Sequence, residues 1–334
     1  MRSTVIFGFC LLIAGSFGLK AQEPGSQPNV DAAQAPATQN PPTSIGAGQV
    51  PVAQQPVAKT TAAAPSAQDL ANQVNNPAAP VTFIQFRDIL APSIAGANGL
   101  ANSLQMQPVL PIGPFKSFPW VQLVKLTMPL YEAIPGTVNL QQLGVSGVGD
   151  LQVFDLITVK QSWGRWGFGP ALVFPTASSK GLGAGKYQIG PSVALIYTGV
   201  KNLTVGAVVQ NPISYAGDPH RPNVNNMIIT PTFTFNLEEG WFVGLSDYNW
   251  TFNWEHGGTA AMPLGVSATF PLGVQVGKVV TIGRQPVSLS VEAGGVAVRP
   301  TGSPNPGWIL GFELSPIFNF HVGPGEKIKV RKQD

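Results

Sequence analysis

The sequence has few charged residues, few histidines and almost no cysteine, and it lacks long apolar runs beyond its N-terminus. Only 10% of its 334 residues are Asp, Glu, Lys or Arg, whereas about a quarter is usual in water-soluble domains. Three histidines and one cysteine, without metal-ligand spacing, argue against a metal centre or a disulfide framework. No later stretch reaches the roughly 20 apolar residues of a membrane-spanning helix. The composition therefore argues against both a soluble domain and a helical membrane protein.

Residues 1–21 have the pattern of an export signal. Arg2 supplies a positive charge, residues 5–19 are largely apolar, and Ala21 is a small residue suited to precede a cleavage site. Cys10 lies inside the apolar run, so we expect the exported chain to contain neither a disulfide nor a thiol nucleophile. The formal net charge of +3 includes Arg2 and Lys20. The exported chain is thus nearly neutral, which gives no case for binding nucleic acid.

Two segments of different composition flank the rest of the chain. Residues 22–80 consist mainly of Ala, Pro, Gln, Asn, Thr and Ser, with few charges and almost no large apolar side chains. Such a segment cannot bury enough surface to offset its chain entropy, so we predict a disordered periplasmic linker. Residues 321–334 form a basic tail that carries Lys327, Lys329, Arg331 and Lys332. We expect this tail to be periplasmic as well.

Between these segments, apolar and polar residues alternate with the two-residue period of β-strands. In residues 227–237, for example, Phe233 and Phe235 alternate with Thr232 and Thr234, so one face is apolar and the other rich in hydroxyl groups. The clearest such segments are residues 120–130, 166–174, 187–197, 203–211, 227–237, 262–270, 287–298 and 308–320. Weaker ones are 81–90, 103–110, 150–159 and 241–254, and in the last the apolar parity shifts, which predicts a bulge.

The connections between these segments alternate between short turns and long loops rich in Gly, Pro and Asn, as in outer-membrane barrels. Aromatic residues such as Trp120, Tyr187 and Trp308 lie near strand ends, where amphipathic rings favour the headgroup level. We therefore predict an all-β fold over residues 81–320. Its form is a transmembrane antiparallel up-and-down β-barrel of about twelve strands, preceded by the disordered N-terminal extension.

If the apolar parity faces lipid, the polar parity lines a lumen. The lumen-lining candidates are Lys125, Asp155, Gln188, Thr230, Thr232, Glu292 and Glu313. An ionisable group in contact with lipid is costly, so opposite charges should meet inside the barrel. Two interpretations stay open: the charged residues pair and plug the barrel, or they line a conduit.

Several stretches resemble a known bacterial family. They are residues 107–111, 147–150, 169–176, 183–187, 216–218 with 221, 222, 224 and 225, and 284–287. Together they resemble the outer-membrane transporters of the phenol meta-degradation type, some of which carry the name neuromedin U. The resemblance covers roughly residues 81–320. It implies a porin-like barrel in the Gram-negative outer membrane and passage of solutes, with aromatic compounds as the suggested class. It supplies no catalytic residues.

The function predicted from the sequence is passive passage of small apolar or aromatic solutes, without catalytic, cofactor or metal-binding residues. Outer-membrane lipid and the barrel-assembly machinery are the expected partners, the latter because the last strand closes on the aromatic Phe320. One alternative is a structural barrel that tethers envelope layers through residues 22–80 and the basic tail. A third is a lipid-modifying enzyme using His256 with Glu255 or Asp247 and Ser267, although no spacing singles out this set.

The predicted topology has a direct test in intact cells. Ser179→Cys lies in a predicted external loop and should react with an impermeant maleimide, whereas Thr61→Cys in the linker should not. Because the exported chain has no other cysteine, the signal is specific. Labelling of Thr61→Cys without Ser179→Cys would reverse the orientation.

Overall fold

The computed structural model describes residues 65–95, 97–137, 144–255, 267–300, 305–318, 320, 322 and 323. All of them lie in one compact unit, Thr61–Asp334. The predicted signal peptide, residues 22–64 of the predicted linker, His256 and nearly all of the basic tail lie outside the described residues. No helix in the described part is long and apolar enough to cross a membrane.

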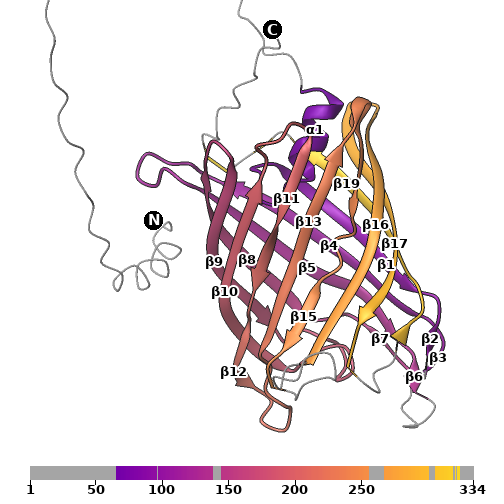
Figure 1. The fold of residues 1–334 in the computed structure, drawn as a ribbon. Helices are drawn as coiled ribbons and strands as arrows, with labels where there is room; N and C mark the ends of the chain where they lie inside the picture. Colours follow the sequence, from indigo (N-terminus) through magenta and orange to yellow (C-terminus); the bar gives the residue numbers. More distant parts are fainter. Residues whose placement is uncertain are drawn as a thin grey trace, which may run out of the picture. The chain divides into compact units, whose positions relative to one another are not determined.

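The alternating segments form a closed antiparallel sheet, as predicted (Figure 1). In the described part, its twelve wall positions are β1 (Thr82–Ala91), β4 (Ala101–Ile112), β5 (Val121–Ile134), β8 (Leu151–Lys160), β9 (Gly164–Phe174), β10 (Lys186–Tyr197), β11 (Leu203–Gln210), β13 (Asn226–Asn236), β14 (Trp241–Leu245) together with β15 (Trp250–Asn253), β16 (Ser267–Ile282), β17 (Gln285–Val298) and β19 (Ile309–Phe318). Each pairs with its sequence neighbour, and the ring closes where β1 pairs with β19. Closure leaves the wall without free edges.

The two ends of the barrel differ. At one end, hereafter the short-turn end, tight connections such as residues 161–163, 198–202 and 283–284 join neighbouring strands. At the other, the long-loop end, the connections carry the short strands β2 (Ile94–Ala95), β3 (Ala97–Asn98), β6 (Gly136–Thr137), β7 (Val145–Gly147), β12 (Ile213–Gly217) and β18 (Asn305–Pro306) (Figure 1). The alternation of short and long connections predicted from the sequence is present.

The alternation in sequence becomes an alternation between the interior and the outer face. In β13, Thr232 is only 7% exposed and lies inside, whereas its neighbour Phe233 is 47% exposed on the outer face. Other strands repeat the pattern: outward Leu195 in β10, Val274 in β16 and Phe312 in β19 are all exposed. An outer wall of large apolar side chains suits lipid rather than water.

The parity shift predicted for residues 241–254 corresponds to a break in the wall. β14 ends at Leu245 and β15 begins at Trp250, and both pair with β13 on one side and β16 on the other. Residues 246–249 between them leave the plane of the sheet. The strand prolines Pro170, Pro191, Pro231 and Pro316, in contrast, are accommodated without a shift of register.

Helix α1 (Ala67–Val74) corrects the prediction that the chain is without structure as far as Pro80. Ser66 caps its N-terminus: the Ser66 hydroxyl accepts from the Asp69 backbone N–H, and the Asp69 carboxylate accepts from the Ser66 N–H. Leu70 and Ala71 are buried. The helix forms because the barrel end supplies the apolar surface that its own sequence lacks.

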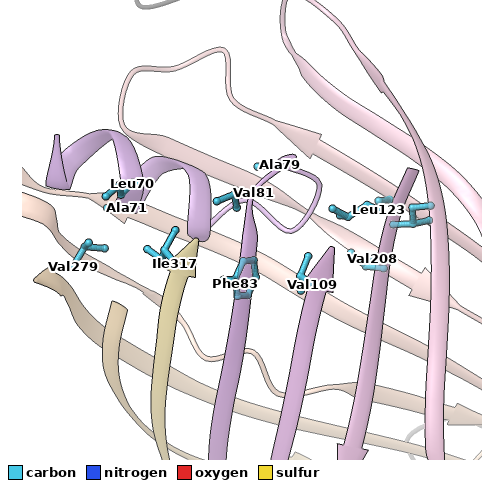
Figure 2. Packing of buried hydrophobic residues seen from close by; sticks show 12 residues of the cluster. Leu70, Ala71, Ala79, Val81, Phe83, Val109, Leu123, Val208, Val279 and Ile317 are labelled. Carbon is cyan, nitrogen blue, oxygen red and sulfur yellow. The ribbon is translucent and has the colours of Figure 1, made fainter. Parts of the chain in front are cut away.

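This apolar surface is a layer that fills the short-turn end of the barrel (Figure 2). Leu70 and Ala71 of α1 lie beside Val279 of β16 and Ile317 of β19. Further members are Ala79, Val81, Phe83, Val109, Leu123, Leu156, Ala194 and Val208. The part of the predicted linker from Ser66 to Pro80 is therefore built into the barrel end.

The two faces of β13 should respond differently to the same substitution. Phe233→Arg places a charge on the outer face and should destabilise the barrel by roughly 2–4 kcal/mol if the site is near the middle of the bilayer. Thr232→Arg points into the lumen and should be far milder. Denaturant titrations in lipid measure both, and equal losses would show that the face assignment is wrong.

Candidate functional site

The interior of the barrel holds a cavity of about 370 Å³. Toward the short-turn end it is bounded by the apolar layer, which includes Phe83, Val109, Leu123 and Val208 of the strands; this boundary is called the floor of the cavity. From that layer toward the long-loop end the lining is mostly polar and includes Gln85, Gln105, Gln107, Thr127, Gln152, Gln210, Thr230, Thr232, Thr234, Asn249 and Gln275. The cavity is thus amphiphilic, with an apolar floor at the short-turn end and a wall of mainly neutral hydrogen-bonding groups, among which the ionisable Arg87, Lys125, Asp247 and Glu313 also lie.

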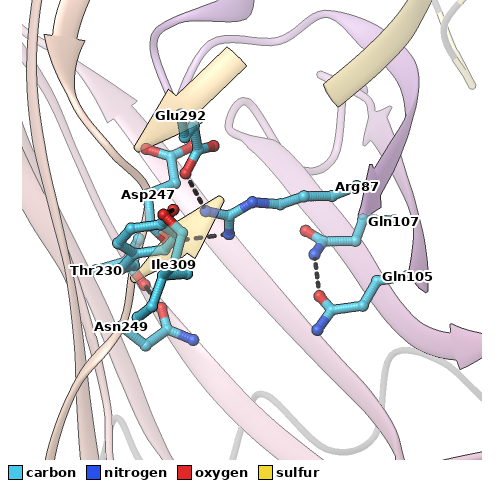
Figure 3. Close-up of polar contacts among 9 residues, drawn as sticks. Arg87, Gln105, Gln107, Thr230, Asp247, Asn249, Glu292 and Ile309 are labelled. Carbon is cyan, nitrogen blue, oxygen red and sulfur yellow. Dashed lines mark hydrogen bonds and ion pairs between the residues drawn. The ribbon is translucent and has the colours of Figure 1, made fainter. Parts of the chain in front are cut away.

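Arg87 of β1 extends inside the lumen past the neighbouring strand β19 and organises a buried cluster (Figure 3). Its Nη2 lies 2.8 Å from Oε2 of Glu292 on β17, and its Nη1 donates to the backbone carbonyl of Asp247 at 3.0 Å. The guanidinium also lies 5.5 Å from the centre of the Tyr248 ring. Because both charged side chains are almost completely buried, each depends on the other to remain ionised inside the barrel.

The break in the wall brings this cluster together. Residues 246–249 turn inward, so that Asp247, Tyr248 and Asn249 all border the cavity. The Tyr248 hydroxyl donates to the carbonyl of Ile309 at 3.3 Å, and the Thr230 hydroxyl donates to Oδ1 of Asn249 at 2.7 Å. The lumen is therefore narrowed by a piece of its own wall, tied to β19 and β13.

Polar side chains of β4 continue the lining on the opposite side. Nε2 of Gln107 donates to Oε1 of Gln105 at 2.7 Å, and Gln105 donates to the Ser103 hydroxyl at 3.0 Å (Figure 3). Lys125 of β5 also borders the cavity, and within the described part of the chain it forms no ion pair. Glu313 of β19 accepts a hydrogen bond from Ser315.

A second cavity, of about 250 Å³, adjoins the first toward the long-loop end. The two share Gln152 and Ile228 in their linings. The loop of residues 175–185 borders this cavity through Leu182 and Ala184. Asp150 fixes the loop, because its carboxylate accepts hydrogen bonds from the backbone N–H groups of Ala177 and Ala184. Arg221 donates to the carbonyl of Lys180 and holds the same loop from the opposite side.

At the short-turn end, α1 and the residues after it lie across the lumen. Val74, Asn75, Asn76, Pro77 and Ala79 border the first cavity. Nδ2 of Asn75 donates to Oδ1 of the buried Asn236 at 2.8 Å, and the Gly240 N–H, in the 3-10 turn η2 (Glu238–Gly240), donates to Gln68 at 3.4 Å. Residues 66–80, named the plug segment below, thus form the floor of the cavity.

The structure distributes the predicted lumen candidates as follows. Lys125, Thr230, Thr232 and Glu313 border the first cavity, Gln188 borders the second, and Glu292 is buried inside against Arg87. The sequence did not single out Arg87 or the inward turn at Asp247. Arg87 shares the inward parity of Phe83 and Gln85 in the sequence. That parity, together with the need of an inward Glu292 for a cation, was the signal that could have identified it.

Asp155 is the exception, and its predicted inward direction is wrong. Its neighbours Gln152 and Phe154 set the inward parity of β8, because both border the cavity. Asp155 has the opposite parity, pairs with Val124, and accepts a hydrogen bond from Gln122 at 3.2 Å. The sequence of β8 has apolar residues on both parities, so the pattern could not decide its direction.

The described residues do not assemble the lipid-modifying site that the sequence suggested around His256. His220 lies exposed in a loop at the long-loop end, 3.2 Å from Asp218. The His220 backbone N–H holds the pKa of the Asp218 carboxyl below its usual value. His256 and His321 lie outside the described residues. Within the described residues, no group of three His, Cys, Asp or Glu side chains could hold a metal ion.

Comparisons with known proteins support the fold. No family model and no curated protein matches the sequence. The structure is similar to the crystal structure of the COG4313 outer membrane channel from Pseudomonas putida F1, with a TM-score of 0.51 and 11% sequence identity. The match covers 71% of this chain and 96% of that chain. At so low an identity the similarity establishes the fold alone, and the resemblance to phenol meta-degradation transporters stays a prediction.

The buried ion pair can be tested by substitution. Glu292→Ala leaves Arg87 buried without its carboxylate and should lower the free energy of unfolding by about 3–5 kcal/mol. The double variant Arg87→Met with Glu292→Met should be clearly less destabilised, because it removes both charges. Denaturant titrations in lipid measure the effects, with exposed Glu238→Ala as control. A double variant as unstable as Glu292→Ala would contradict the pairing.

Proposed function

We propose that this protein is an outer-membrane conduit for passive passage of small, uncharged apolar or aromatic solutes. The observation that carries the proposal is the pair of adjoining cavities, which extends from the long-loop end to the plug segment. Exposed apolar side chains on the outer face, the predicted export signal and the similarity to an outer membrane channel support the membrane location. The proposal requires no catalysis, cofactor or nucleic acid.

The chemistry of the lumen supports the solute class. Arg87 and Glu292 neutralise each other, and most of the remaining polar lining is Gln, Thr and Asn. Such a lining is better suited to uncharged solutes than to strongly selective passage of ions. Phe83, Leu123 and Val208 offer an apolar surface at the short-turn end of the same cavity. The aromatic class itself comes from the sequence resemblance.

Passage requires the plug segment to move, because it forms the cavity floor. Its polar attachments to the barrel include the Asn75–Asn236 and Gln68–Gly240 hydrogen bonds. Each such bond contributes about 1 kcal/mol, since water replaces the partner when the bond breaks. We propose that the segment swings out at the periplasmic side while β1, to which it is joined, stays in the wall.

The rival function is a structural barrel without transport, which tethers envelope layers through its N-terminal extension and basic tail. The plug segment and the Arg87 cluster favour it, because both obstruct the lumen. The two functions differ in one measurable property. A conduit admits solute when the plug segment is free to move, and a tether does not.

A reversible cross-link tests the movement. A Cβ atom built on Gly240 lies 3.1 Å from Cβ of Ala67, somewhat shorter than the roughly 3.5–4.5 Å of a disulfide. Because Gly240 has a φ of +81°, the Gly240→Cys single variant also measures the strain of the substitution itself. In liposomes, Ala67→Cys with Gly240→Cys should block uptake of phenolic solutes when oxidised and restore it when reduced. Uptake is measured as solute entry, with sugars as the comparison solute.

The single variants Ala67→Cys and Gly240→Cys serve as controls, since each carries half of the change and neither forms the bridge. Uptake that is equal with the bridge oxidised and reduced would show that the plug segment does not gate the lumen. If phenols and sugars both fail to enter and single-channel recordings are silent, the tethering function replaces transport.

A further inference from the structure

The outer wall carries a groove of about 620 Å³ that the proposed solute path does not use. It crosses β16, β17, β19, β1 and β4, and its lining is almost entirely apolar. The side chains that form it are outward-facing and well exposed, among them Val276, Leu289, Val291, Phe312 and Leu314. The groove therefore lies where the proposed membrane location would place lipid.

The strand register shows the course of the groove. One edge follows the paired residues Lys278, Leu289 and Leu314, and the other follows Val276, Val291 and Phe312. The second edge continues through Asp88 of β1 to Leu104 of β4. Because neighbouring strands are about 4.8 Å apart, the four steps from β16 to β4 span about 19 Å. The strands of such barrels are tilted, so the groove climbs diagonally along the wall.

The two ends of the groove carry opposite charges. At the short-turn end, the Lys278 ammonium lies 4.8 Å from the centre of the Trp241 ring, and Trp241 is 42% exposed. Within the described residues Lys278 forms no ion pair. At the far end, Asp88 accepts a hydrogen bond from Asn102. The charges therefore favour an amphiphile that binds with an anionic headgroup at Lys278.

We propose that this groove is a binding site for one phospholipid of the periplasmic leaflet. The phosphate lies at Lys278 beside Trp241, at the level where an amphipathic ring and a basic side chain favour headgroups. One acyl chain lies along Leu289, Val291 and Phe312. The paired Asp88–Asn102 side chains mark the end of the apolar path. The site rests on the proposed membrane location and is independent of solute passage.

Native mass spectrometry of the full barrel, purified in detergent and supplied with phosphatidylglycerol or phosphatidylcholine, tests the site. The unchanged protein should retain one phospholipid. Lys278→Gln should lower retention of phosphatidylglycerol about fivefold, the effect of one basic residue near a headgroup. Val291→Trp fills the groove and should remove both lipids. Lys201→Gln, in a turn at the same end, and outward Val193→Trp on β10 are the matched controls.

Equal retention by Lys278→Gln and Lys201→Gln would overturn the headgroup site, and equal retention by Val291→Trp and Val193→Trp would overturn the acyl-chain path. Retention of lipopolysaccharide in place of phospholipid would also overturn the proposal. Circular dichroism establishes that every variant is folded. Solute uptake measured on the same preparations separates the two hypotheses, because a barrel that conducts solute but retains no phospholipid refutes the groove alone.

Discussion

Closure of the strand ladder between β1 and β19 is the constraint on which the rest of the structure depends. Once the ring is closed, every strand side chain points either into a narrow interior or onto the outer wall. A polar side chain inside must find partners on nearby strands or on a segment that turns inward. Arg87 meets this requirement by reaching from β1 to Glu292 on β17 and to the Asp247 carbonyl. The same closure leaves the outer face to large apolar residues such as Phe312.

The lumen is bordered or narrowed at three levels that differ in how strongly each is held. The loop of residues 175–185 at the long-loop end is tied by Asp150 and Arg221, the Arg87 cluster lies midway, and the plug segment fills the short-turn end. Separating Arg87 from Glu292 would leave a buried charge unpaired, at a cost of about 3–5 kcal/mol. The polar groups of α1 regain water when it leaves, so each of its hydrogen bonds costs only about 1 kcal/mol. Leaving the barrel end also exposes the buried Leu70 and Ala71 to water, but it leaves no buried charge unpaired. The plug segment is therefore the level that we propose opens.

The sequence predicts those features that depend on the two-residue period, and it fails where tertiary contacts decide. Thr232 and Phe233 were assigned to the correct faces because β13 alternates cleanly. Asp155 was not, since β8 has apolar residues on both parities. Helix α1 was missed because a short stretch with one leucine and one valine as its only large apolar residues is stable only against the barrel end. The parity shift near residue 246 signalled an irregularity, but only the structure reveals that the segment enters the lumen.

The inward segment is stable because one backbone bond and several side-chain bonds replace the ladder that it interrupts. Where β14 and β15 are separated, the Ser246 N–H donates to the Gly273 carbonyl, and the Trp250 indole donates to the Pro271 carbonyl. Thr230 bonds to Asn249 on the other side of the break. In lipid, polar backbone groups must be satisfied within the protein, so these contacts let the wall bend inward without exposing its ladder. The constriction at Asp247 is consequently part of the wall, whereas the plug segment, which we propose moves, is attached to the wall only through β1 and its contacts at the barrel end.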